Sequence, residues 1–402
     1  MIRMLAIGTL ITFAFFSCES NTSKFKNYEP LIVINDTIPN KITEIPGQYI
    51  ISFDERRTDS IENTFTFLEK ISFLQRSAFL SKMFQPLKLQ DSSIISLTPY
   101  DFVAKLDTNQ LSIIKARPGV KFLEKDYLIE VHPNIAVEVA LSTEEICWGI
   151  TRVSNNVKGN RQYDKLVWII DSGVDPFHED LNVEKKLSKS FYPETNYGDV
   201  QGEGNDHGTQ VAGVIGAIAN GRGVIGMAPN VRIVAVKFMH NRKFRLSNYL
   251  DALSYVNANA RKGDIVNLSI QNTPESSRAD YLIHEMSRKG IFVVISAGNL
   301  NQNVDNGGIY PAKMNGNNIY TVSSFDEGDL FSDFSNYGPS VDVSAPGRMI
   351  LTTLPGNKYG LNEGTSFAAP FVSGLLLLNG TFKMDKQIKN DPDSRKDSVG
   401  HE

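Results

Sequence analysis

The chain has 402 residues, which is enough for two or three domains of ordinary size. Its 41% content of hydrophobic residues and its 17 prolines are typical of a globular protein and exclude a collagen-like or repetitive chain. The formal net charge of −4 creates no bulk field that would attract nucleic acid, and two cysteines are too few for a disulfide scaffold.

The N-terminus, residues 1–18, predicts export. Arg3 precedes an apolar run from Met4 to Phe16, and Ser17 and Cys18 follow it. This order is typical of a secretory signal peptide, and the run is short for a membrane span. Because the cysteine stands at the expected cleavage position, the segment also resembles a bacterial lipobox, in which lipid on that cysteine anchors the protein to an extracytoplasmic membrane surface. An ordinary signal with an incidental cysteine is the alternative.

A polar segment, residues 19–45, predicts a tether. Residues 46–140 then predict a small α+β domain with the ferredoxin-like order β-α-β-β-α-β. The expected elements are a strand at 48–53, a helix at 61–72, strands at 94–97 and 100–106, a helix at 108–115 and strands at 120–124 and 127–131. A connector, residues 134–146, follows.

Residues 147–382 predict an α/β domain. Near-continuous apolar strands alternate with helical patterns, which indicates a doubly wound, mainly parallel sheet covered by helices on both faces. Sites in such sheets form at the carboxyl ends of the strands. Cys147 is expected to be a small core residue, and residues 383–402 are read as a polar tail, disordered from Asn390 onward.

Four polar residues lie where such a site is expected. Asp171 and Asn299 end buried strands, while His207 and Ser366 lie in the first turns of helices. Each has an ordinary structural alternative: a capped or buried carboxylate, a turn amide, a packed imidazole and a helix N-cap. Together they supply the acid, oxyanion donor, base and nucleophile that acyl transfer needs.

Three motifs around these residues resemble those of subtilisin-family serine endopeptidases. They are Ile-Ile-Asp-Ser-Gly at Asp171, Asp-His-Gly-Thr-Gln-Val-Ala-Gly at His207 and Gly-Thr-Ser-Phe-Ala-Ala-Pro at Ser366, in the family's order. The resemblance implies that Ser366 attacks the peptide carbonyl, that His207 takes its proton and that Asp171 orients His207. It also implies that Asn299 and the Ser366 N–H bind the oxyanion, and that this chemistry requires no cofactor.

The resemblance extends to substrates and to processing. It implies polypeptide substrates, and it implies that residues 46–140 are the protein's own inhibitory propeptide, removed by self-cleavage between Val139 and Ile146. The residues expected to bind substrate are Ser269, Ile270, Gln271, Ser296, Ala297 and Gly298. Gln271 stands where the family usually has glycine. The basic stretch His240–Leu246 either selects acidic residues upstream in the substrate or is a solvated edge.

A structural calcium ion is also implied, with Asp180 and Asn220 among its oxygen ligands. Two further interpretations remain beside the general endopeptidase. One is a maturation protease of narrow specificity that removes a leader peptide. The other is a non-catalytic binding protein on the same fold.

Overall fold

The computed structural model describes residues 39–53, 94–97, 101–117, 119–132, 135–154, 159–201, 204–393 and 396–402. The predicted signal, Cys18, most of the tether and the helix expected at 61–72 lie outside these residues. Within the described residues, no helix is both long enough and apolar enough to cross a bilayer.

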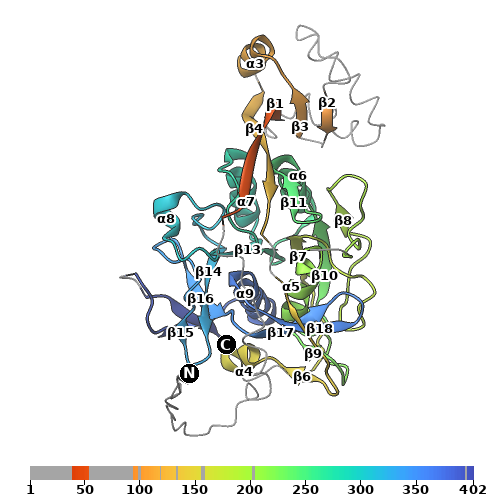
Figure 1. Ribbon diagram of the computed structural model, residues 1–402, viewed down its shortest axis with the longest axis vertical. Helices are drawn as coiled ribbons and strands as arrows, with labels where there is room; N and C mark the ends of the chain where they lie inside the picture. The colour runs from red at the N-terminus through yellow and green to blue at the C-terminus, as the bar shows by residue number, and fades with distance from the viewer. Residues whose placement is uncertain are drawn as a thin grey trace, which may run out of the picture.

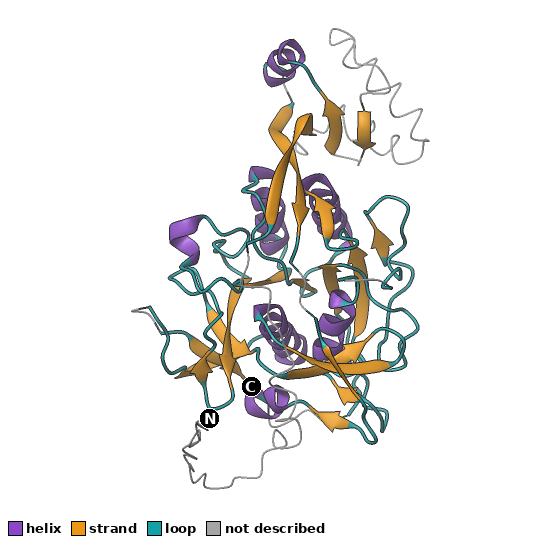
Figure 2. Ribbon diagram, in the orientation of Figure 1, coloured by secondary structure: helices purple, strands orange, loops and turns teal. Residues whose placement is uncertain are grey.

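A ten-stranded sheet forms the centre of the C-terminal unit (Figures 1 and 2). Its strand order is β19-β20-β16-β14-β13-β12-β7-β10-β8, with β15 paired to β14. The pairs from β8 to β20 along this order are parallel. The strands are β7 (Leu166–Asp171), β8 (Lys189–Ser190), β10 (Arg232–Lys237), β12 (Ile265–Leu268), β13 (Phe292–Ser296), β14 (Ile319–Asp326), β15 (Leu330–Phe331), β16 (Val343–Pro346), β19 (Lys383–Gln387) and β20 (Ser398–His401).

Helices cover both faces of this sheet, as the sequence predicts. α5 (His207–Gly216) and α9 (Thr365–Asn379) pack on one face, and α6 (Leu246–Asn259) and α7 (Ser277–Arg288) lie on the other (Figure 1). Alternate residues of β7 therefore enter two different cores, so the strand is apolar from Leu166 to Ile170. The remaining elements of this unit are α4 (Trp148–Val153), β9 (Val224–Ile225), β11 (Lys243–Arg245), α8 (Val304–Gly307), β17 (Ile350–Leu354) and β18 (Lys358–Asn362).

The N-terminal unit is an antiparallel sheet with one described helix. Its strands are β1 (Lys41–Phe53), β2 (Ile94–Leu97), β3 (Asp101–Lys105) and β4 (Val120–Glu130), and its helix is α3 (Thr108–Lys115). The helix has the predicted bounds, and Asp107 and Gln110 form a capping box at its start. The two strands expected between 120 and 131 are one continuous strand, because β1 pairs along most of its length.

Two carboxylates of β4 dock this unit on the helices of the C-terminal unit. Asp126 accepts hydrogen bonds from the N–H and Oγ of Ser247, at 3.1 and 2.7 Å, at the start of α6. Glu124 accepts from the Ser276 Oγ at 2.7 Å and the Arg278 N–H at 3.0 Å, at the start of α7. Both helix N-termini, which favour negative charge, are therefore capped by the other unit.

A buried ion pair lies in the same interface. The Arg278 Nη2 is 3.0 Å from Oδ2 of Asp101, and the two side chains are 0% and 2% exposed. The Ser254 Oγ donates a further hydrogen bond to this carboxylate oxygen at 3.0 Å. Burial removes both charged groups from water, and their mutual attraction offsets part of this desolvation cost.

The connector pairs with the C-terminal unit through two short strands. β5 (Val137–Val139) pairs with β18, and β6 (Glu145–Ile146) pairs with β9. The segment in which the sequence predicts self-cleavage, residues 139–146, thus begins at the end of β5 and ends in β6.

The tail differs from its prediction. The disorder expected from Asn390 onward is wrong for the described residues, because β20 pairs in parallel with β16 and Val399 is fully buried. Ile388 is also buried, and the Glu402 N–H donates to the Val153 carbonyl. The polar composition hid a short strand whose one apolar side chain, Val399, faces the core.

Cys147 is a buried free thiol, as predicted. Burial raises its pKa to about 11. A pKa near 11 leaves roughly 10²-fold less thiolate at pH 8 than an ordinary thiol, because each pKa unit is tenfold. We expect iodoacetamide to leave Cys147 unmodified in the native protein at pH 8 and to modify it fully in urea, as read from the mass of its tryptic peptide. Rapid modification of the native protein would contradict the buried position.

Candidate active site

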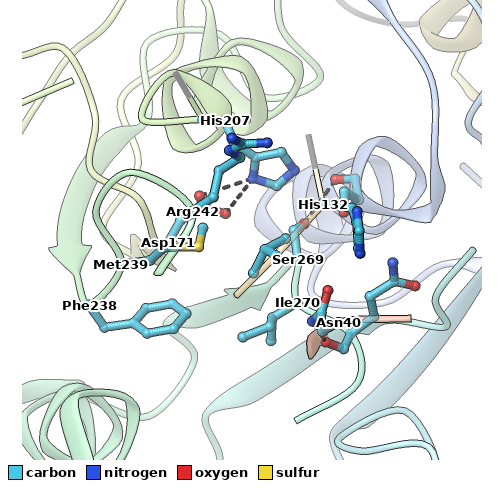
Figure 3. A pocket seen from close by; sticks show the side chains of 13 residues that line it. Asn40, His132, Asp171, His207, Phe238, Met239, Arg242, Ser269 and Ile270 are labelled. Carbon is cyan, nitrogen blue, oxygen red and sulfur yellow. Dashed lines mark hydrogen bonds and ion pairs between the residues drawn. The ribbon is translucent and has the colours of Figure 1, made fainter. Parts of the chain in front are cut away.

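Asp171 and His207 meet at the carboxyl end of β7. The Nδ1 of His207 lies 2.9 Å from Oδ2 and 3.0 Å from Oδ1 of Asp171 (Figure 3). Asp171 is 2% exposed, and its Oδ1 also accepts a 2.6 Å hydrogen bond from the Ser172 N–H. A carboxylate in this position accepts a hydrogen bond from Nδ1–H and leaves Nε2 of the imidazole as the acceptor.

Close packing places the two residues together. An added Cβ on Gly208 would lie 2.2 Å from the Gly173 carbonyl oxygen, so only glycine allows α5 to begin this near to β7. The Ser172 Oγ accepts from the Gly208 N–H at 3.1 Å and donates to the Asn205 carbonyl. The start of the helix and the end of the strand are thereby joined directly.

Lys237 stabilises the turn that follows Asp171. It is the partner of Asp171 in the β10–β7 register, and its Nζ donates to the carbonyls of Ser172 and Met239. Burial lowers the pKa of Lys237 to about 8, and the negative charge of Asp171 opposes this shift. Nothing in the sequence distinguishes this residue, because a lysine that ends an apolar strand resembles a solvated strand terminus.

Ser366 lies in the first turn of α9 and lines the same pocket as Asp171 and His207. The adjacent Phe367 ring packs edge-on against the His207 ring, with 5.7 Å between centroids. The Ser269 Oγ donates to the Ser366 carbonyl at 2.9 Å. Gly364 precedes the helix with a φ of 133°, a conformation that favours glycine. The serine is therefore held at a helix N-terminus, where free N–H groups stabilise negative charge.

Asn299 is oriented by the residue before the serine. Its Oδ1 accepts hydrogen bonds from both the N–H and the Oγ1 of Thr365, each at 2.8 Å. Thr365 Oγ1 in turn accepts from the Gly298 N–H at 2.9 Å. Because its oxygen accepts two hydrogen bonds, the amide NH₂ is the end of this side chain that can donate to an oxyanion.

The N-terminal unit reaches this pocket. The lining residues are Asn40, Val131, His132, Asp171, Gly204, His207, Phe238, Met239, Arg242, Ser269, Ile270, Gln271 and Ser366 (Figure 3). The end of β4 pairs antiparallel with β11, and the Val131 N–H donates to the Arg242 carbonyl at 2.8 Å. Glu130 forms ion pairs with Lys243 at 3.3 Å and Lys41 at 3.2 Å.

The predicted substrate-binding residues divide into two groups. Ser269, Ile270 and Gln271 line the pocket, whereas 296–298 do not and are almost fully buried. The sequence analysis missed His132 and Asn40, since nothing local distinguishes them. It identified the basic stretch around Arg242, and an acidic residue, Glu130, lies against that stretch in the structure.

The two predicted metal ligands, Asp180 and Asn220, form a hydrogen bond with each other. The Asn220 Nδ2 donates to Oδ1 of Asp180 at 2.7 Å, and the Val224 N–H is 3.2 Å from Oδ2. Glu144 accepts the N–H groups of Asn220 and Gly221, both at 2.7 Å. Among the described residues, no group of three or more His, Cys, Asp or Glu side chains could hold a metal ion.

Comparison with known proteins agrees with this geometry. A model of the subtilase family matches residues 164–382, more than half of the chain. The chain belongs to the subtilase family. Subtilisin NAT from Bacillus subtilis subsp. natto is 33% identical over 282 residues, 68% of this chain and 69% of that protein. Alkaline elastase YaB from Bacillus sp. (strain YaB) is 28% identical over 356 residues, 86% of this chain and 84% of that one.

A crystal structure of a cold adapted subtilisin-like serine proteinase is similar to this subtilase, with a TM-score of 0.53 and 27% identity. The match covers 63% of this chain and 96% of the other. Family and fold together establish a subtilisin-like serine protease, whose substrates are polypeptides and whose chemistry needs no cofactor.

Proposed function

We propose that this subtilase is an exported endopeptidase that cleaves peptide bonds through an acyl-enzyme on Ser366. The contact of Asp171 with His207 in the same pocket as Ser366 carries the proposal. The Ser366 Oγ attacks the carbonyl carbon while His207 accepts its proton at Nε2, and Asp171 stabilises the imidazolium. The C–N bond then breaks, and His207 returns the proton to the leaving amine.

Water completes the cycle by the same route. His207 takes a proton from the water as its oxygen attacks the acyl carbon, and the proton returns to the Ser366 Oγ as the ester bond breaks. In both halves the Asn299 NH₂ and the Ser366 N–H donate to the oxyanion. An amide donor of this kind contributes about 10²–10³ in turnover in subtilisin.

We also propose that the chain is made as a zymogen with its N-terminal unit as inhibitor. Three observations support this: the capped helix starts, the buried Asp101–Arg278 pair and the approach of Val131 and His132 to the pocket. A strand that follows β11 into the pocket competes with any substrate that would use the same edge. The lipid anchor on Cys18 remains part of this proposal on sequence grounds alone.

Narrow specificity is a second proposal, favoured by the contact between Glu130 and Lys243. If the strand around Glu130 follows the path of a substrate, an acidic residue upstream of the cleaved bond would meet the same lysine. Selection of this kind suits a protease that matures a small set of exported proteins.

A calcium ion does not fit the predicted site as it is arranged here. Asn220 presents its NH₂ to Asp180, and both carboxylate oxygens already accept hydrogen bonds. A hard cation needs oxygen ligands in that space. No step of the proposed mechanism depends on a metal.

The test is labelling and self-cleavage of the full chain. We expect wild type to react with a fluorophosphonate at Ser366, as located by mass spectrometry, and the Ser366→Ala variant not to react. N-terminal sequencing should show a new end within residues 140–146 in wild type only. Unlabelled and intact wild type would favour the binding protein.

A further inference from the structure

We propose that Gln271 is a specificity-determining residue that closes the space for the side chain just before the scissile bond, so that this enzyme prefers a small residue there. The inference rests on the proposed function. It concerns which acyl group can reach Ser366 and leaves the identity of the nucleophile unchanged.

The space in question lies between two segments that leave neighbouring strands. β12 and β13 are parallel and paired up to Leu268 and Ile295. The chain after β12 lies against the serine, since the Ser269 Oγ bonds the Ser366 carbonyl. The chain after β13 leads to Asn299, the proposed oxyanion donor. A side chain on the carbon beside the attacked carbonyl must therefore enter between these two segments.

Gln271 spans this space. Its Oε1 accepts a hydrogen bond from the Asn299 N–H at 2.5 Å. An added Cβ on Gly298 would lie 2.5 Å from the Asn336 Nδ2, 2.8 Å from the same Oε1 and 3.3 Å from the Gln271 Cβ, so the glutamine and Asn336 side chains together cover the glycine backbone. Gln271 itself is 9% exposed. The wall formed by Gly298 is therefore covered, which explains why residues 296–298 do not line the pocket.

The energetic consequence depends on substrate size. We expect a methyl group to fit beside the glutamine without moving it. A benzyl group must displace the amide, which breaks the hydrogen bond to Asn299 and leaves a buried N–H without a partner. Because that N–H belongs to the residue that supplies the oxyanion donor, a large residue also disturbs the transition state.

The experiment compares two covalent probes on the full-length protein. They are tetrapeptide diphenyl phosphonates, Ile-Glu-Val followed by the phosphonate analogue of alanine or of phenylalanine, and the measured quantity is the second-order rate constant for labelling Ser366. In wild type we expect the alanine probe to react faster. Gln271→Gly should raise the phenylalanine-to-alanine ratio roughly 10- to 100-fold, the range that burial of an aromatic side chain supplies. Residues 128–132 compete with both probes for the pocket to the same extent. This competition therefore does not change the ratio of the two rate constants.

The matched control is Gln302→Gly, which removes an exposed glutamine outside the pocket and should leave the ratio unchanged. An unchanged ratio in Gln271→Gly, with Ser366 still labelled, would overturn the inference alone. Equal loss of both rates would also overturn it, because Gln271 would then act on the catalytic groups and not on the bound residue. Failure of both probes in every protein, wild type included, would overturn the proposed function and this inference with it.

Discussion

Replacing Asp171 with asparagine is expected to lower the turnover of peptide substrates by about 10⁴-fold, the loss known for this change in a serine protease triad. The asparagine oxygen can still accept the Ser172 N–H, which Oδ1 of Asp171 does at 2.6 Å. Its NH₂ then faces Nδ1 of His207 and donates to it. The neutral imidazole therefore carries its proton on Nε2, and this nitrogen can no longer accept the proton of Ser366.

The measurement is the release of a chromophore from a peptide anilide, with thermal unfolding recorded on the same samples. Asp264→Asn is the matched control, because Asp264 is also buried and accepts the Leu166 N–H and the Trp168 Nε1 at the opposite end of β7. We expect that variant to keep its activity within a few-fold. Retention of more than a tenth of the activity by Asp171→Asn would remove Asp171 from the mechanism.

Replacing Arg278 with alanine is expected to weaken the docking of the N-terminal unit by about 3–5 kcal/mol, because it leaves the Asp101 carboxylate buried without its cation. The change is made in the Ser366→Ala protein, so that self-cleavage does not obscure the result. Hydrogen exchange of the β1 and β3 amides in urea reports the free energy at which this unit separates.

Two further variants test the cause of that loss. Arg288→Ala removes an exposed arginine, 58% accessible in its pair with Glu285, and should change the free energy by under about 0.5 kcal/mol. The double replacement Asp101→Leu with Arg278→Met should recover most of the loss, since an apolar pair avoids the desolvation of two charges. If Arg278→Ala shifts the free energy by less than about 1 kcal/mol, the buried pair does not hold the interface.

Much of the catalytic unit could be predicted from the sequence because its signals are local. Asp171 follows an apolar strand, and His207 and Ser366 open helices among glycines that only close packing explains. Such a pattern requires no knowledge of distant partners. The doubly wound sheet followed from the same alternation of buried strands and helices.

The remainder depends on contacts between distant residues. The choice of His132 as a pocket residue depends on the pairing of β4 with β11, more than a hundred residues later. The position of Gln271 in the sequence identified it as a substrate-binding candidate. Whether its side chain turns back to Asn299 or points to solvent depends on its rotamer, which the sequence does not specify. In the tail, Val399 and Ile388 were too few to produce a periodic signal, although each is buried.

The strand β19 has a consequence for how molecules of this protein behave in a crowded solution. It forms one edge of the large sheet, and its five residues are all exposed. An open edge offers unpaired backbone groups to a strand from another molecule, and such pairing begins aggregation. Lys383, Asp385 and Lys386 place charged side chains along this edge, and charges of this kind disfavour pairing with another strand. The first residues of the predicted polar tail thus form a charged border that disfavours pairing with another sheet.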